Sequence, residues 1–359
     1  MADPLLEVTG LSKTFHVAKG PSGSGRLRAL DSVDLTLGRG ETLGLVGESG
    51  CGKSTLARTL LMLEQPDEGQ VRFDGQDPFR LKGKELLTWR RRIQMVFQDP
   101  FASLNARMTA AEIISEPWAT HRSLYRTARE RTARARELLE LVGLRSADAD
   151  RFPQEFSGGQ RQRIGIARAL ALDPDVIVCD EPVSALDLSV QAQVINLLDD
   201  LQRQLHVSYL FISHDLSVVR HIADRVAVMY LGRILETGAT ESVLDGPLHP
   251  YTAALTSAAP VLDVSRERTG QRILLKGEIP SPVDPPSGCH FRTRCWQAED
   301  LCAEQTPHPQ AQTQTQAHQP HEGTVGPDGP PEDGGSRHSA ACHFPLEDTT
   351  EGAALTVNR

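Results

Sequence analysis

The chain has 359 residues, which at about 150 residues per domain corresponds to roughly two domains, or to one large domain with appendages. Hydrophobic residues make up 39% and charged residues 24%, which excludes a collagen-like, coiled-coil or wholly disordered chain. The net charge of -9 supplies no positive field for bulk nucleic-acid binding. No stretch reaches the roughly 20 apolar residues that cross a bilayer, and the acidic N-terminus lacks an export-signal pattern, so we expect a cytosolic protein.

Residues 1–246 alternate strand-like and helix-like segments, the pattern of an α/β sheet. Residues 6–8 and 33–37 alternate as half-buried strands do, and residues 42–46 form a mostly apolar strand. Residues 176–179 and 209–213 predict two further buried strands. Helix formers dominate from about 106 to 170. We therefore predict a helical subdomain inserted into an α/β core.

The composition changes after residue 246, and residues 247–345 are predicted to form a C-terminal extension. It begins with a short helix around residues 251–259 and becomes proline-rich near 280–286, which favours an extended connector. Residues 306–337 have almost no large apolar side chains and are predicted to be disordered, and residues 346–359 form a tail. Four cysteines of the extension suggest a metal site in a reducing compartment: Cys289, Cys295, Cys302 and Cys342.

The segment GESGCGKST follows a predicted strand and opens a predicted helix, which fits a phosphate-binding loop in spelling and in context. Glycines let backbone N–H groups turn inward around the phosphates. Lys53 would reach the β and γ phosphates, and Ser54 would offer its hydroxyl to Mg²⁺. Cys51 is expected only to fill a position that takes a small residue. The predicted nucleotide contacts are Gly47, Glu48, Ser49, Gly50, Cys51, Gly52, Lys53, Ser54 and Thr55.

Two adjacent carboxylates, Asp180 and Glu181, follow the apolar strand at residues 176–179. Ligands of α/β sheets bind at the carboxyl ends of the strands. Successive strand side chains point in opposite directions, so the two carboxylates must divide the work. Asp180 would hold Mg²⁺ through its water shell, and Glu181 would act as the general base on the attacking water. Cys179 is expected to be a small buried hydrophobe.

The segment FSGGQRQR at residues 156–163 resembles the signature of ATP-binding cassette ATPases. Other elements of that family follow in order: aromatic Phe15, Gln98 in FQDP, Asp187 at the end of SALD, and His214 in ISHD. The resemblance implies a P-loop NTPase fold with a RecA-like α/β core, an antiparallel β edge and an inserted helical subdomain. It also implies a head-to-tail dimer with two ATP molecules sandwiched between the chains.

The resemblance implies a role for each matching residue. Phe15 would stack on adenine, Gln98 would sense the γ-phosphate and Mg²⁺, and His214 would contact the γ-phosphate. Small residues at the helix N-terminus of the signature would form an anion site. The implied catalytic residues are Glu181, His214 and Gln98, and the implied Mg²⁺ residues are Ser54, Gln98 and Asp180. Outside the phosphate loop, the implied nucleotide contacts are Phe15, Gln98, Asp180, Ser157, Gly158, Gly159, Gln160, Asp187 and His214.

Three segments point to one subgroup of this family: FQDPFASLN (97–105), CDEPVSALD (179–187) and HPYT (249–252). They resemble the ATPase subunits of bacterial dipeptide and oligopeptide importers, and the F-type subunit more than the D-type. The implied partners are a paralogous ATPase, two integral-membrane permeases and, indirectly, an extracytoplasmic substrate-binding protein. The implied location is peripheral, at the cytoplasmic face of the inner membrane.

Peptides are the expected cargo, and nickel, glutathione or oligosaccharides are the alternatives. A soluble cassette ATPase of translation or DNA repair is disfavoured, because such proteins usually carry two cassettes or a long coiled coil. A cassette that only binds nucleotide would be expected to lose a catalytic element. Lys53, Gln98, Asp180, Glu181 and His214 are all present, which favours hydrolysis.

The cysteine segment, with GCHFRTRC at residues 288–295, resembles the tail in which four cysteines of these subunits bind an iron–sulfur cluster. Four thiolates suffice for a [4Fe-4S] cluster. Zn²⁺ is the alternative, although zinc ribbons usually place their paired cysteines two to four residues apart. The Gln/His-rich insertion before Cys342 departs from the family pattern. Since the cost of loop closure grows only logarithmically with length, the insertion does not exclude Cys342 as the fourth ligand.

Overall fold

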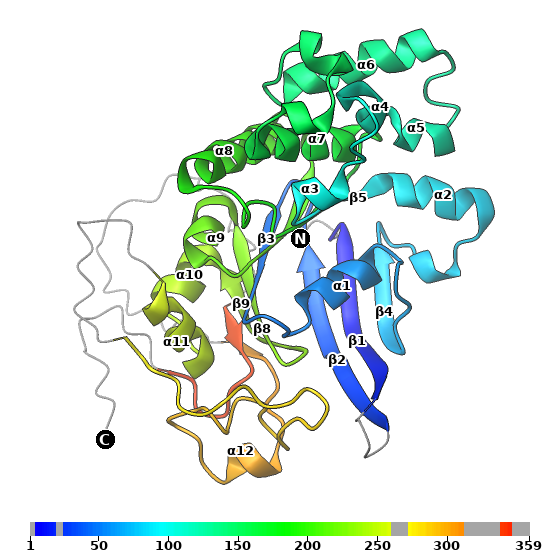
Figure 1. Cartoon of the computed structure of the whole chain (residues 1–359). Coiled ribbons are helices and arrows are strands. Elements are labelled where there is room, and N and C mark those ends of the chain that lie inside the picture. Colours follow the sequence, from blue (N-terminus) through cyan, green and yellow to red (C-terminus); the bar gives the residue numbers. More distant parts are fainter. Residues whose placement is uncertain (1–3, 19–23, 260–271, 312–337, 347–359) are drawn as a thin grey trace, which may run out of the picture.

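Two sheets with helices packed around them form the core of the molecule (Figure 1). The structure is a computed structural model that describes residues 4–18, 24–259, 272–311 and 338–346. The smaller sheet is antiparallel, in the order β2–β1–β4. Its strands are β1 (Leu6–Ala18), β2 (Ser24–Leu37) and β4 (Glu68–Phe73).

The larger sheet has the order β10–β11–β9–β8–β3–β7–β6–β5. Strands β8, β3, β7, β6 and β5 are parallel, with β5 at the edge of the sheet, whereas β9 runs antiparallel to β8. Central parallel strands are covered on both faces, which explains their continuous apolar runs. The strands are β3 (Thr42–Val46), β5 (Ile93–Val96), β6 (Val176–Asp180), β7 (Ser208–Ser213), β8 (Arg225–Tyr230), β9 (Arg233–Ala239), β10 (Gln310–Ala311) and β11 (Ser339–Ala340).

Helices surround the sheets, and α4 to α7 gather at one end of the molecule as the predicted insertion (Figure 1). The predicted α/β core with an antiparallel edge and a helical subdomain is thus confirmed. The helices are α1 (Lys53–Leu60), α2 (Gly83–Arg92), α3 (Pro100–Ser103), α4 (Ala110–Ser115), α5 (Pro117–Thr120), α6 (Ala128–Leu141), α7 (Gly158–Leu170), α8 (Leu188–Leu205), α9 (Leu216–Ile222), α10 (Thr240–Asp245), α11 (Pro250–Ala258) and α12 (Leu301–Glu304).

Strand β6 shows how the parallel sheet divides the core into two clusters. Val176 and Val178 pack on one face with α1 and the antiparallel sheet, and Ile177 and Cys179 pack on the other with the helical subdomain. This alternation is the one expected of a strand buried on both sides. Cys179 is fully buried, as predicted, and burial raises the pKa of its thiol.

The C-terminal extension shares the core of the cassette. Phe291 is fully buried and lies against Tyr230 and Tyr251, with ring centroids 5.4 and 5.3 Å away. Strand β11 pairs with β9, and β10 pairs with β11. The prediction of disorder is therefore wrong at Gln310–Ala311, because the edge of the sheet satisfies backbone groups in a segment that lacks apolar side chains. Residues 312–337 and 347–359 lie outside the described residues.

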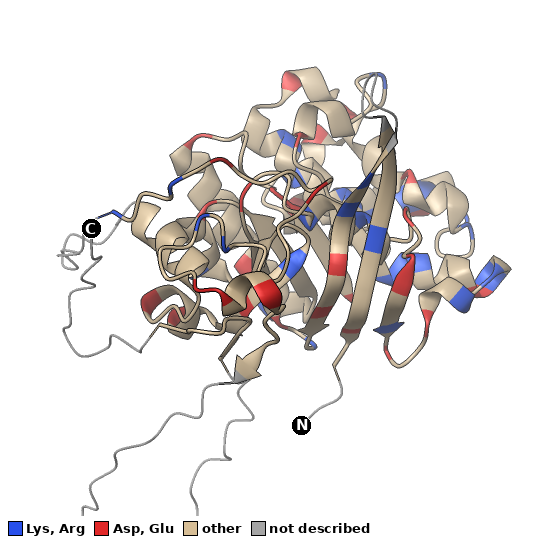
Figure 2. Cartoon of the chain, turned by 90° about the horizontal axis from the view of Figure 1, so that it is seen from below, with Lys and Arg blue, Asp and Glu red and all other residues tan. Residues whose placement is uncertain are grey.

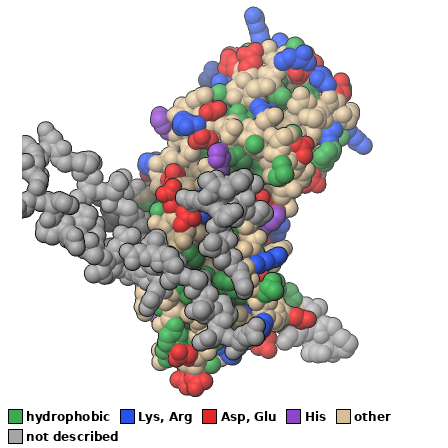
Figure 3. Space-filling view, turned by 90° about the vertical axis from the view of Figure 1, so that its left-hand side faces the viewer, with side chains coloured by type: hydrophobic (Ala, Val, Ile, Leu, Met, Phe, Trp, Pro, Cys, Tyr) green, Lys and Arg blue, Asp and Glu red, His purple; other side chains and the backbone are tan. Residues whose placement is uncertain are grey.

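The surface carries charges of both signs in an interspersed pattern. Figure 2 shows acidic and basic segments scattered among the elements, and in Figure 3 both signs lie side by side on the upper lobe, which is the helical subdomain. None of the helices in the described ranges has the length and apolarity that a membrane span needs.

Candidate nucleotide-binding site

The phosphate loop joins β3 to α1 and depends on two glycines. Gly47 has φ +152°, and a Cβ there would lie 2.1 Å from the carbonyl oxygen of Met229 on β8. Gly52 has φ +114°, and a Cβ there would lie 2.4 Å from the carbonyl oxygen of Ala29 on β2. Only glycine combines these backbone angles with so close an approach. The loop is therefore held against both sheets.

Lys53 is the first residue of α1, and its side chain folds back under the loop. The residue is 6% exposed, and Nζ donates to the carbonyl oxygens of Gly47 (2.7 Å) and Glu48 (3.0 Å). Nζ also lies 3.6 Å from Sγ of Cys51, which is buried as predicted. These partners are neutral, so the charge of Lys53 remains available to attract phosphate.

Asp180 ends β6 beside the phosphate loop. Burial raises the pKa of its carboxyl group and the charge of Glu181 raises it further, whereas Lys53 and a hydrogen bond with Ser54 lower it. The Ser54 hydroxyl and the Asp180 carboxylate are oxygen ligands of the kind that Mg²⁺ prefers. These two residues fit the predicted Mg²⁺ site.

Glu181 joins the two other predicted catalytic residues. Its Oε2 accepts a hydrogen bond from Gln98 Nε2 at 2.9 Å, and its Oε1 accepts one from His214 Nδ1 at 3.1 Å. Gln98 follows β5, Glu181 follows β6 and His214 follows β7, which are neighbouring parallel strands. Since parallel strands end at the same edge of a sheet, three residues distant in the sequence converge. Glu181 has φ +45°, an uncommon conformation for a residue other than glycine.

A cavity of about 560 Å³ lies over the loop, within the size range of small-ligand sites. Phe15 lies in its wall, and Nζ of Lys13 is 5.4 Å from the centre of the Phe15 ring. Pro282 of the C-terminal extension also lines it. The predicted residues in the wall are Phe15, Ser49, Gly50, Cys51, Gly52, Lys53, Ser54, Thr55, Gln98, Glu181 and His214.

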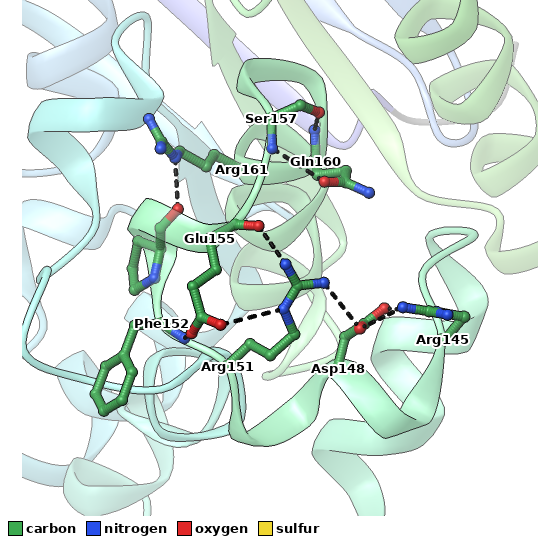
Figure 4. Close-up of polar contacts among 9 residues, drawn as sticks. Arg145, Asp148, Arg151, Phe152, Glu155, Ser157, Gln160 and Arg161 are labelled. Atoms are coloured by element: carbon green, nitrogen blue, oxygen red, sulfur yellow. Dashed lines mark hydrogen bonds and ion pairs between the residues drawn. The ribbon is translucent and has the colours of Figure 1, made fainter.

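The signature segment caps helix α7 away from this cavity. Ser157 Oγ accepts from the backbone N–H of Gln160 at 3.3 Å, and Gln160 Oε1 accepts from the backbone N–H of Ser157 at 3.0 Å (Figure 4). A Cβ on Gly159 would lie 2.3 Å from Cγ1 of Val190 on α8. Ser157, Gly158, Gly159 and Gln160 do not line the cavity, so the fold does not bring the signature to the chain's own phosphate loop.

An ion-pair network around the buried carboxylate of Asp148 precedes the signature in the chain (Figure 4). Asp148, with a side chain that is 6% exposed, pairs with Arg145 at 2.9 Å and with Arg151 at 3.1 Å. These hydrogen bonds, first that from Arg145, lower the pKa of Asp148. Arg161 of α7 donates to the carbonyl oxygen of Pro153 at 2.6 Å. The segment before Ser157 is thereby tied to the turn at residues 145–151 and to α7.

Asp187 has a structural role in this chain. Its carboxylate accepts from the Ser189 hydroxyl at 2.7 Å and from the backbone N–H of Val190 at 3.0 Å, and so caps α8. These hydrogen bonds lower its pKa. Asp187 is not among the residues that line the cavity, and its contact with nucleotide stays a prediction.

The four cysteines of the extension line one small cavity. Burial raises the pKa of Cys295 to about 11 and that of Cys342 to about 12. Among the described residues, however, no three or more His, Cys, Asp or Glu side chains form a group that could hold a metal ion. The structure therefore does not support the predicted metal-binding character of the extension. It shows three buried thiols, Cys289, Cys302 and Cys342, and the partly buried thiol of Cys295 around one small cavity.

Sequence reasoning missed the residues through which the extension contacts the phosphate loop. Tyr251 accepts a hydrogen bond from the backbone N–H of Glu48 at 2.9 Å, and Arg294 pairs with the Glu48 carboxylate at 2.7 Å. This pairing raises the pKa of Arg294. Arg294 directly precedes Cys295, but no spacing rule links that position to residue 48.

Comparison with known proteins identifies the class as the ATP-binding cassette ATPases. Residues 30–184 match the family model for ABC transporters, and residues 235–302 match that for the C-terminal region of oligopeptide/dipeptide transporters. A dimeric post-hydrolysis structure of the ATP-binding cassette MJ0796, bound to ADP and Pi, is similar with a TM-score of 0.58 and 30% identity. The match covers 66% of this chain and 98% of that one.

Two relatives define the family more closely. The oligopeptide transport ATP-binding protein AppF of Bacillus subtilis is 54% identical over 308 residues, which cover 85% of this chain and 93% of AppF. The dipeptide transport ATP-binding protein DppF of Haemophilus influenzae is 52% identical over 306 residues, covering 85% and 92%. The chain belongs to the family of ATP-binding proteins of oligopeptide and dipeptide ABC transporters.

Replacing Gly52 tests the geometry of the phosphate loop. Gly52→Ala places a Cβ against the Ala29 carbonyl, so we expect MgATP affinity to fall at least about tenfold, as the loop must move. Gly40→Ala is the matched control, since Gly40 also has positive φ (+66°) but nothing within 4 Å of an added Cβ. Isothermal titration with MgATP measures both. Equal affinities for the two variants would contradict the proposed role of the close approach.

Proposed function

We propose that this ATPase energises the import of peptides across the cytoplasmic membrane as a subunit of a multi-subunit ABC transporter. The observation that carries the proposal is the convergence of Gln98, Glu181 and His214 beside the phosphate-loop cavity. Relatives with 52–54% identity bear the names of oligopeptide and dipeptide transport proteins, which favours peptides over nickel, glutathione or oligosaccharides.

In the proposed mechanism the loop N–H groups and Lys53 bind the phosphates. Ser54 and Asp180 would hold Mg²⁺, which offsets phosphate charge when it is bound with ATP. Glu181 accepts a proton from the attacking water as the water oxygen bonds to the γ-phosphorus and the bond to ADP breaks. Gln98 and His214 donate to the two carboxylate oxygens of Glu181 and so keep that group oriented.

The site is proposed to be completed by a second ATPase chain. The Ser157 end of α7 lies away from the cavity, and a partner in head-to-tail arrangement would present its own signature to the γ-phosphate. The dimeric state of the MJ0796 cassette supports this arrangement. For this chain the partner is proposed to be a paralogous ATPase, forming a heterodimer.

The proposed contact with two permeases lies at residues 98–105, at the cytoplasmic face of the inner membrane. Phe101 in this segment and Phe97 directly before it are 63% and 44% exposed, unusual for large apolar side chains. The Arg161 guanidinium lies 4.0 Å from the centre of the Phe101 ring and links this surface to α7. An extracytoplasmic binding protein would act on the ATPase only through the permeases.

We also propose that Cys289, Cys295, Cys302 and Cys342 hold a [4Fe-4S] cluster, with Zn²⁺ as the alternative. Their common cavity supports the proposal. His249, 1% exposed, lines the same cavity; its Nδ1 accepts from the N–H of Tyr251 at 3.0 Å. Its Nε2 therefore carries the proton and has no partner among the described residues, which suits a sulfur acceptor. In a [4Fe-4S] cluster each of the four thiolates binds a different iron, so the four sulfur atoms lie farther apart than the ligands of a single metal ion.

Two substitutions separate hydrolysis from binding. Glu181→Gln removes the proton acceptor, so we expect ATP turnover to fall by about 100-fold or more with little change in nucleotide affinity. Lys53→Ala removes the phosphate-binding charge and should weaken MgATP binding itself. Steady-state phosphate release measures the turnover of each variant, and nucleotide titration measures its affinity. Near-normal turnover of Glu181→Gln would show that Glu181 is not the general base.

The proposed role in transport predicts that this chain forms a specific complex with membrane subunits. The tagged full chain, extracted from native membranes in mild detergent, should co-purify with two permeases and a second cassette ATPase. Phe101→Asp, which places a charge on the exposed ring position, should reduce permease recovery about tenfold or more, while Leu63→Asp, at a residue 66% exposed elsewhere, should not. Recovery without any membrane subunit would contradict the transport proposal.

The cysteine site is tested by metal and sulfide analysis. Anaerobically purified protein should be brown and contain about four irons and four sulfides per chain. Cys342→Ser should reduce the iron content, and Cys51→Ser, at a buried cysteine of the phosphate loop, should leave it unchanged. Zinc at one equivalent without iron or sulfide would support the alternative, and an iron content unaffected by Cys342→Ser would remove that ligand.

A further inference from the structure

The C-terminal extension holds a residue of the phosphate loop through an ion pair. Arg294 donates from Nη1 to Oε2 of Glu48 at 2.7 Å and from Nη2 to Oε1 at 3.1 Å, across a sequence separation of 246 residues. The Arg294 and Glu48 side chains are 8% and 24% exposed. A bidentate pair of this kind fixes orientation as well as charge.

The backbone of Glu48 makes two further hydrogen bonds. Its N–H donates to Oη of Tyr251 at 2.9 Å, and its carbonyl oxygen accepts from Nζ of Lys53 at 3.0 Å. Tyr251 is fully buried and packs against Tyr230 and Phe291. The residue that supports the phosphate-binding lysine is therefore anchored by a rigid aromatic cluster and by a guanidinium.

The charge of Glu48 makes this anchor relevant to ligand binding. A free carboxylate in a loop that surrounds phosphates would repel them. The pair with Arg294 offsets this charge, and Glu48 is not among the residues that line the cavity. The loop can then present its N–H groups and Lys53 to the phosphates without competition.

We propose that Arg294 and Tyr251 are positioning residues for ATP, which hold the phosphate loop and neutralise Glu48 so that the C-terminal extension sets nucleotide affinity. The cassette depends in this way on a segment outside its nucleotide-binding motifs. The proposal is independent of the cargo, of the partner subunits and of a cluster at the cysteines.

The test uses the full chain and MgATP. Arg294→Gln should weaken MgATP binding by about tenfold, because the Glu48 charge is left without its partner. The change should appear in KM far more than in kcat, since the residues around the attacking water are untouched. Adding Glu48→Gln should restore most of the affinity by removing the repulsion. The defect of Arg294→Gln should also shrink in high salt, which screens the charge of the partly exposed Glu48 carboxylate.

Arg220→Gln is the matched control. Arg220 makes a similar two-pronged pair with Asp245, both distances being 3.0 Å, away from the cavity, and its loss should leave MgATP affinity unchanged. Tyr251→Phe keeps the buried ring and loses only the hydroxyl that accepts from the Glu48 N–H. This variant tests the proposal if Arg294→Gln does not fold. We expect it to weaken binding about threefold. Parental affinity in the folded variants, or a further loss on adding Glu48→Gln, would overturn the proposal.

Discussion

The ammonium group of Lys53, held beneath the phosphate loop by two backbone carbonyls, is the interaction on which the site depends. A buried cation is stable only where oxygen atoms surround it, and the loop supplies them from Gly47 and Glu48. The loop can take this shape because β3 lies between β7 and β8 in the parallel sheet and because glycines permit contact with both sheets. Because these two carbonyl groups are neutral, they do not cancel the charge of Lys53, which can therefore attract phosphate.

The order of strands explains the catalytic geometry. The carboxyl ends of β3, β7, β6 and β5 form one edge, and each contributes one part of the site: the phosphate loop, His214, Glu181 and Gln98. The signature is excluded from this edge because it begins a helix of the inserted subdomain. Its capped end is not among the residues that line the cavity, which is why we propose that another chain completes the site.

Much of this arrangement could be predicted from the sequence because it rests on local patterns. The strand at residues 42–46 has the predicted bounds. The loop after it lines one cavity with Gln98, Glu181 and His214, as predicted. The link between Arg294 and Glu48 could not be predicted, because a contact from an irregular segment has no periodicity and depends on how the extension packs. The short strand Gln310–Ala311 was missed for a similar reason, since its order comes from pairing with β11 and not from its own composition.

In the proposed complex, this chain's nucleotide is enclosed by a partner's signature, while its own signature serves the partner. Vanadate-dependent trapping of a photoreactive ATP analogue in the assembled complex tests it most directly, since label can be assigned to each ATPase chain. The Ser157→Arg variant should abolish trapping on the partner's phosphate loop and leave labelling of this chain's loop in place. Loss of trapping on this chain, with the partner's label retained, would contradict the account.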